Sequence, residues 1–151
     1  MTGKTLSLLE GDSRNLVFLL DESLIPAVGN ALNLVGYRFI STVVAFEKRA
    51  NVKDPEVIEW AKSNRAVWVH ADDSAKREHR KLILAAEIRT VWLYRRKGKM
   101  SDKEMLRALS FAMPEILERF DKHPARRHLK VSTHGAEPHP AIRVEDYDML
   151  G

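Results

Sequence analysis

Short apolar runs recur along the first two thirds of the chain and predict a buried sheet. The run from Leu16 to Leu20 is apolar at every position, without the alternation expected of a strand that faces water on one side. A continuous run of this length is typical of a strand buried on both faces, as in a parallel sheet. Runs rich in aliphatic, β-branched and aromatic residues predict strands at residues 15–20, 37–46, 66–70 and 90–94, with an edge strand at 129–132.

Between these runs, apolar residues recur at helical spacing. They predict helices over residues 26–36, 54–61, 75–86 and 101–120. Ser101 and Glu104 match a capping box at the start of the last helix, which Pro114 interrupts, so we expect a kink or two successive helices there. Strands that alternate with helices predict an α/β fold, a three-layer α/β/α sandwich around a mostly parallel central sheet of four or five strands.

The composition narrows the class of protein. A length of 151 residues with 44% hydrophobic and 30% charged residues fits one globular domain, which we expect over residues 1–132. Residues 133–151 lack periodicity and are expected to form a C-terminal tail or arm. No apolar run approaches the roughly 20 residues of a membrane helix and no leader is recognisable, so we expect a cytoplasmic protein without a membrane partner. The absence of cysteine excludes disulfides, thiolate nucleophiles and zinc–thiolate sites.

The net charge of +4 conceals an uneven distribution. Residues 1–75 carry eight Lys and Arg against ten Asp and Glu, a net charge of −2. Residues 76–99 carry nine against two, a net charge of +7, and residues 100–151 carry eight against nine, a net charge of −1. The basic block is either a solvated face or a surface that binds a polyanion.

Acidic residues follow two of the predicted strands directly. Asp21 and Glu22 come after the first strand, and Asp72 and Asp73 come after the third. Because the carboxyl ends of parallel strands line one crevice, we expect these side chains to meet there, and the loop before Asp54 is long enough to bring a further carboxylate to them. Clustered carboxylates repel one another unless a hard cation such as magnesium or manganese offsets their charge. The set therefore predicts a metal centre.

Each of these residues also has a purely structural interpretation. Asp54, which precedes Pro55, has the pattern of a helix N-cap, and one of the two aspartates after the third strand is expected to cap the next helix. Glu22 is equally well a solvated loop acid. His70, at the end of the third strand, is either a core histidine or a hydrogen-bond partner of a metal-bound water.

Three segments in register resemble the PIN-like family. They are Leu-Leu-Asp-Glu-Ser-Leu at residues 19–24, Lys-Asp-Pro-Glu-Val-Ile-Glu-Trp-Ala at 53–61 and Val-Trp-Val-His-Ala-Asp at 67–72. The similarity covers roughly residues 15–95 and looks closest to PIN-like proteins grouped with VapC-type toxins. It implies a parallel α/β/α fold and ribonuclease activity that depends on Mg²⁺ or Mn²⁺, together with a cognate antitoxin protein.

Residue by residue, the resemblance assigns the catalytic metal ligands to three aspartates: Asp21, Asp54 and Asp72. Secondary acids are expected at Glu22, Glu56 and Asp73. The chain departs from the family pattern at His70, where the pattern has Thr, and at Ser74, where it has a second Asp. Asp73, shifted by one position, is the candidate substitute for that acid.

The leading hypothesis is therefore a metal-dependent endoribonuclease in which a metal-activated water attacks an RNA phosphodiester. The basic block supplies the candidate phosphate-binding residues Arg77, Arg80, Lys81, Arg95 and Arg96. The alternatives are a PIN-like binding module with weak or no activity and a phosphoacceptor receiver domain, which needs a fifth strand that ends in lysine before a helix. A homodimer is a further expectation, through apolar residues of the 105–120 region.

Overall fold

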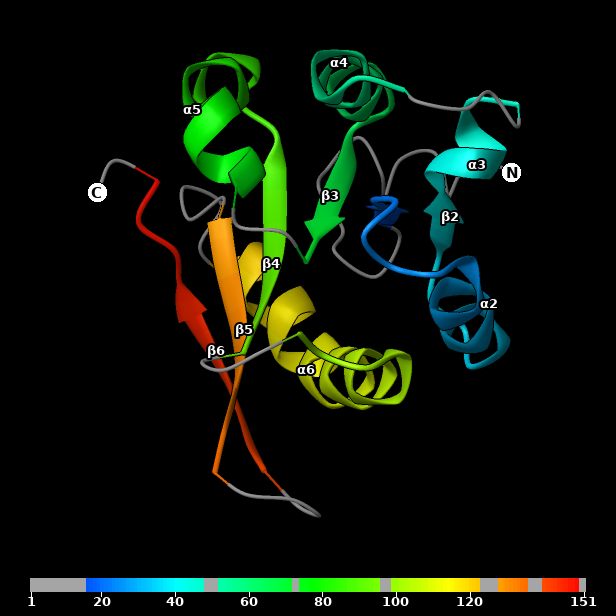
Figure 1. Ribbon diagram of the computed structural model, residues 1–151, viewed down its shortest axis with the longest axis vertical. Helices are drawn as coiled ribbons and strands as arrows, with labels where there is room; N and C mark the ends of the chain where they lie inside the picture. The colour runs from blue at the N-terminus through cyan, green and yellow to red at the C-terminus, as the bar shows by residue number, and fades with distance from the viewer. Residues whose placement is uncertain are drawn as a thin grey trace.

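The computed structural model describes residues 16–47, 52–71, 74–95, 99–122, 128–135 and 140–149, without the side chains of 74–77. These residues form one six-stranded sheet in the order β2-β1-β3-β4-β5-β6 (Figure 1). The strands are β1 Val17–Leu20, β2 Phe39–Ser41, β3 Ala66–His70, β4 Arg89–Arg95, β5 His128–His134 and β6 Ala141–Asp146. The pairs from β2 through β5 are parallel, and β6 is antiparallel to β5.

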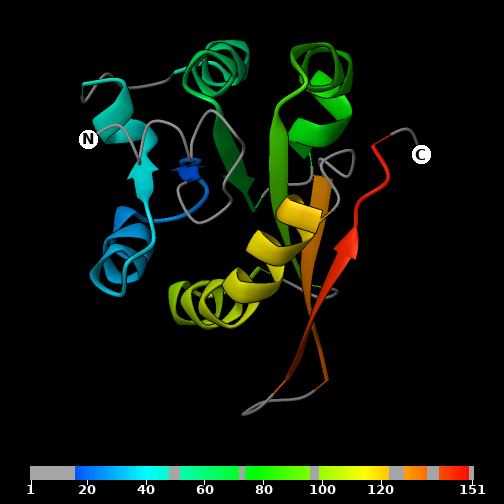
Figure 2. The same ribbon diagram turned by 180° about the vertical axis from the view of Figure 1, so that it is seen from behind.

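Helices cover both faces of the sheet, which confirms the predicted three-layer α/β/α class. They are α2 Pro26–Leu34, α3 Thr42–Ala45, α4 Asp54–Asn64, α5 Ser74–Ala86 and α6 Asp102–Lys122. In Figures 1 and 2, α4 and α5 lie side by side on one face, and α2 and α6 lie on the other. Leu20 and Val69 point into the core beneath α2 and α6, whereas Leu19 and Trp68 point into the core beneath α4 and α5. Because successive strand residues enter opposite cores, β1 and β3 are apolar at nearly every position.

The second predicted strand is shorter than expected. The sequence predicts a strand over residues 37–46, but β2 ends at Ser41 and α3 follows at once. The Ser41 hydroxyl accepts a hydrogen bond from the Val44 N–H at 3.3 Å, as an N-cap serine does. This cap overrides the β-propensity of Val43 and Val44, which lie on the surface, 43% and 64% exposed.

Of the two outcomes expected at Pro114, two successive helices do not form, but the helix axis bends along its length (Figures 1 and 2). α6 runs continuously from Asp102 to Lys122 with Pro114 inside it. Pro114 has no N–H to donate to the carbonyl four residues earlier in the helix. Because Pro114 is exposed, that carbonyl lies on the solvent side of α6. The apolar stripe from Met105 to Phe120 is buried against the sheet rather than free for a partner. Phe111, 67% exposed, is a large apolar side chain that α6 leaves on the surface.

The segment predicted as a C-terminal arm contributes the edge strand β6. Val144 pairs with Val131 and Ala141 with His134, so β5 lies inside the sheet and not at its edge. Of the six residues in β6, Val144 alone is buried. With so little apolar surface, this strand leaves almost no periodic signal in the sequence.

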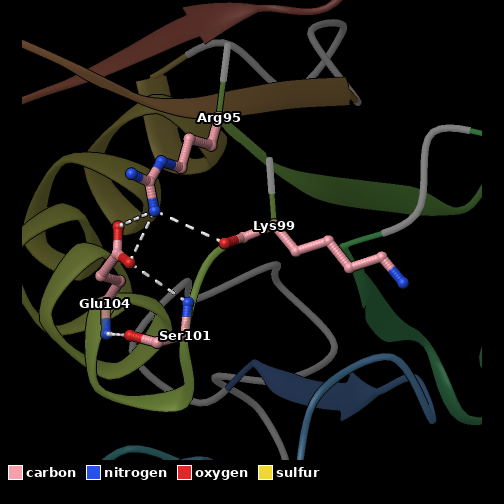
Figure 3. A network of polar contacts seen from close by, with 4 residues as sticks. All are labelled: Arg95, Lys99, Ser101 and Glu104. Carbon is pink, nitrogen blue, oxygen red and sulfur yellow. Dashed lines mark hydrogen bonds and ion pairs between the residues drawn. The ribbon is translucent and has the colours of Figure 1, made fainter. Parts of the chain in front are cut away.

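The predicted capping box at the start of α6 is confirmed (Figure 3). The Glu104 N–H donates to Ser101 Oγ at 3.2 Å, and the Ser101 N–H donates back to Glu104 Oε1 at 3.3 Å. Arg95, at the end of β4, donates from Nη1 to both Glu104 oxygens, at 2.8 and 3.0 Å. The box therefore also ties the end of β4 to the beginning of α6.

Gly29 marks the closest approach of α2 to the sheet. A Cβ atom at this position would lie 2.7 Å from Leu20 Cδ1 and 3.1 Å from Phe39 Cβ, and both of those side chains are buried. We expect Gly29→Ala to destabilise the protein in urea unfolding, because overpacking of about 1–3 kcal/mol outweighs the roughly 1 kcal/mol that Ala gains in a helix. Asn30→Ala, at the next and exposed position, is the matched control. Equal stability of the two variants would refute this account of the packing.

Candidate metal centre

Two neighbouring strands deliver the first two side chains of the site. Leu20 pairs with Val69 in the parallel register, so Asp21 and His70 come next to each other at the carboxyl ends of β1 and β3. The Asp21 N–H donates to the Val69 carbonyl at 2.9 Å, which extends the pairing by one step. His70 Nε2 lies 3.1 Å from Asp21 Oδ2, and both residues are buried, 3% and 8% exposed. The imidazole and the carboxylate thus form a buried pair at the crevice of the sheet.

Ser23 fixes the Asp21 carboxylate in the turn after β1. The Ser23 N–H donates to Asp21 Oδ2 at 3.0 Å, which is the geometry of an Asx turn. Ser23 Oγ accepts the Ala71 N–H at 3.0 Å, so the same residue joins the end of β1 to the end of β3. These bonds hold the carboxylate in one orientation, which a ligand or catalytic group requires.

The third side chain comes from the first turn of α4. Asp54 is the first helical residue, the N-cap position belongs to Lys53, and no side chain caps this helix end. The N-cap interpretation of Asp54 is therefore wrong. Ligand atoms of Asp21, Asp54 and His70 all lie within 4.8 Å of one another. Pro55 suits this first turn, because its fixed φ is already helical and its missing N–H would have no partner within the helix.

The two carboxylates of the site repel each other, and this repulsion affects the protonation of Asp54. Burial raises the pKa of Asp54 above its ordinary value of 3.8, and the nearby Asp21 carboxylate raises it further. His70 and His79 act in the opposite direction, with smaller effects. Two partly desolvated carboxylates in one crevice are stabilised by a cation between them. The donor set of two carboxylates and one imidazole therefore fits a divalent metal ion, and an ion there would be held by Asp21, Asp54 and His70.

His79 is a fourth group beside the centre, and the sequence analysis did not single it out. Its backbone is non-helical, with φ −120° and ψ 18°, and it marks a kink inside α5. Its Nε2 lies 3.5 Å from Asp54 Oδ2. The one available signal was that His79 is the single histidine of the basic block at residues 76–99.

A cavity of about 300 Å³ opens over these groups. Asp21, Asp54 and His70 line it together with Glu22, one of the predicted secondary acids. Glu56 is placed elsewhere, in a surface depression beside Phe46 on the outer side of α4. It points away from the centre because it lies two residues after Asp54 on the helix.

The remaining predicted site residues are the third-motif aspartates and the cations of the basic block. Asp72, Asp73 and Arg96 lie outside the described residues, as does the side chain of Arg77. Arg80 and Lys81 are exposed on α5, directly after His79. Arg95 is engaged with Glu104 in the network of Figure 3, so part of its charge is offset within the protein.

Comparisons with known proteins add little to this geometry. No protein-family profile matches the chain, and no curated protein matches it. Among solved structures, an aromatic aminotransferase from Pyrococcus horikoshii aligns at a TM-score of 0.35 and 11% identity, over 86% of this chain. The chain spans 36% of the length of that enzyme. Among the described residues, no helix is long and apolar enough to cross a membrane.

The raised pKa of Asp54 predicts an effect on stability. The folded, metal-free protein holds the Asp54 proton more tightly than the unfolded chain does, so this group lowers stability as the pH rises above 3.8 through its folded pKa. We expect Asp54→Asn to raise the Tm of the metal-free protein at pH 7 by a few degrees, with a gain that shrinks toward pH 4. Thermal melts in EDTA at several pH values measure it. Glu59→Gln, on the exposed side of α4, is the control, and a lower Tm for Asp54→Asn at pH 7 would contradict the assigned repulsion.

Proposed function

We propose that the protein is a metal-dependent endoribonuclease of the PIN-like type, the toxin of a toxin–antitoxin pair that acts in the cytoplasm. The observation that carries the proposal is the convergence of Asp21, Asp54 and His70 on one polar cavity. Two of these residues are the aspartates that the resemblance assigns to the metal. They come from separate segments, the end of β1 and the start of α4, as that resemblance requires.

In this proposal the acidic side chains bind the metal ion and the basic side chains bind phosphate. Asp21 and Asp54 hold a Mg²⁺ or Mn²⁺ ion, with Asp72 as the third aspartate of the family pattern. A divalent ion supplies a water of lowered pKa and offsets charge on a phosphate. The contact of His79 with Asp54 brings α5 to the edge of the cavity, and α5 continues into Arg80 and Lys81. Arg80 and Lys81, both exposed on α5, are the phosphate-binding groups in this proposal.

The electrostatics of the crevice match this division of tasks. Carboxylates line the cavity, and the basic block begins in α5 beside it, so a cation and a polyanion have adjacent sites. Phosphate contacts from Arg and Lys fix a nucleic acid without reading its sequence.

The experiment is cleavage of a mixed RNA substrate by the purified full-length protein. We expect cleavage with Mg²⁺ or Mn²⁺ and none in excess EDTA, with activity restored when the ion is added back. Cleavage that persists in EDTA would refute the metal mechanism. A protein that binds RNA and metal without turnover would instead be the PIN-like binding module, an alternative that His70 in place of Thr favours.

The receiver-domain alternative is not supported by the topology. That fold requires a helix after the fifth strand, whereas β5 is followed by the antiparallel strand β6. Failure of acetyl phosphate to label the protein would agree with this conclusion.

A further inference from the structure

We infer that the centre selects a first-row transition-metal ion, such as Mn²⁺, Co²⁺ or Zn²⁺, over Mg²⁺, because His70 supplies an imidazole nitrogen as a ligand. The inference rests on the metal site of the proposed function and not on cleavage of RNA. It starts from the position where the chain departs from the PIN-like pattern. A ring nitrogen of His70 belongs to the same cluster of ligand atoms as the two aspartate carboxylates, and Nε2 lies 3.1 Å from Asp21 Oδ2.

The ring of His70 is held in its orientation by aromatic packing. Trp68, two residues earlier on the same face of β3, meets the ring edge-on with centroids 4.9 Å apart and planes at 84°. Trp92, the register partner of His70 on β4, lies 5.3 Å away at 31°. The two indoles and the burial of His70 restrict the imidazole to one orientation, with Nε2 toward Asp21. A ligand nitrogen that is fixed before the ion arrives loses little entropy on binding.

The donor set determines which ions bind well. Mg²⁺ prefers an octahedron of oxygen atoms and keeps several waters, whereas imidazole suits Zn²⁺ and other transition ions. With two carboxylates alone the centre would be a hard site for Mg²⁺ or Mn²⁺. One buried imidazole beside them changes the order of preference, because affinity for nitrogen rises along the first-row series from Mn²⁺ to Cu²⁺, and Zn²⁺, below Cu²⁺, still binds imidazole well.

A competing interpretation gives His70 a positioning role alone. In that case its Nε2 would donate a hydrogen bond to Asp21 in the loaded protein too, as partners of metal ligands often do. This role predicts an equal loss of affinity for every ion when His70 is replaced. A ligand role predicts a loss confined to ions that favour nitrogen.

The test is calorimetric titration of the metal-free, full-length protein with Mn²⁺, Zn²⁺ and Mg²⁺ in the absence of RNA. We expect His70→Gln, which offers an amide oxygen in place of nitrogen, to weaken Zn²⁺ binding by about 10–100-fold, Mn²⁺ binding by a smaller factor and Mg²⁺ binding by less than about 3-fold. His134→Gln is the matched control, because His134 lies on β5 and contacts Ser132. A loss of affinity that is equal for all three ions would overturn the inference.

Pulsed EPR of the Mn²⁺-loaded wild-type protein tests the same inference without depending on the folding of a variant. We expect ¹⁴N coupling from one imidazole, retained in His134→Gln and lost in His70→Gln. Bound Mn²⁺ without such coupling would overturn the inference. If coupling is present and no RNA is cleaved, the proposed function fails while the metal assignment stands.

Discussion

Replacement of Asp21 by asparagine is expected to lower metal-dependent RNA cleavage by more than about 100-fold, since even the hydrogen-bond partners of metal ligands are worth 10–100-fold. Asp21 is the carboxylate on which the other groups converge. His70 lies 3.1 Å from its Oδ2, the Ser23 N–H donates to the same oxygen at 3.0 Å, and Asp54 shares its ligand cluster. Asparagine keeps the shape and loses the charge that attracts a cation. Initial cleavage rates at saturating Mn²⁺ measure the effect.

Glu59→Gln provides the control for Asp21→Asn, because it removes one negative charge from the exposed side of α4. We expect its cleavage rate to stay within about 2-fold of wild type, as exposed charges contribute little. Circular dichroism verifies that both variants are folded. An Asp21→Asn protein with wild-type activity would exclude the proposed centre.

Replacement of Trp92 by alanine is expected to destabilise the protein by about 3–5 kcal/mol, the range for truncation of a large buried aromatic residue. Trp92 is 2% exposed, and its ring contacts Trp68, His70 and Tyr147 at centroid distances of 6.0, 5.3 and 5.9 Å. Its Nε1 also donates to Thr90 Oγ1 at 2.7 Å. For a chain of this size the loss corresponds to a fall in Tm of about 6–20 °C. Urea and thermal unfolding measure it.

Two further variants separate the contributions of Trp92. Trp92→Phe keeps an aromatic ring against His70 and removes the hydrogen bond to Thr90, so we expect a smaller loss, which includes about 1 kcal/mol for that bond. Tyr94→Ala, on the same face of β4 but 38% exposed, is expected to have the smallest effect of the three. Equal stabilities of Trp92→Ala and Tyr94→Ala would contradict the assigned core.

The parts of the fold that the sequence predicts well are those with the most buried apolar surface. β1 and β3 enter two cores at once, so the apolar runs at residues 16–20 and 66–70 locate them closely. The acid after β1 follows from the same reasoning, because a charged residue directly after a fully apolar strand must lie at its carboxyl end. This reasoning alone predicts the position of Asp21 from the sequence.

The features that the sequence does not predict depend on contacts between distant segments. His70 was interpreted as either a core residue or a partner of bound water, since nothing in the sequence shows that its ring faces Asp21 across β1 and β3. His79 reaches Asp54 through a kink in α5, and a local backbone angle of this kind leaves no periodic signal. β6 is held by main-chain pairing with β5 and buries one side chain, so propensity alone could not reveal it.

The proposed function depends on one divalent ion held jointly by Asp21, Asp54 and His70. A crystal of the full-length protein soaked in Mn²⁺ tests it directly, through the anomalous signal of the ion. We predict an anomalous peak bounded by the two carboxylates and His70 Nε2, within the cavity of about 300 Å³. A map with no peak there, or with its peaks only at other carboxylates, would contradict the account.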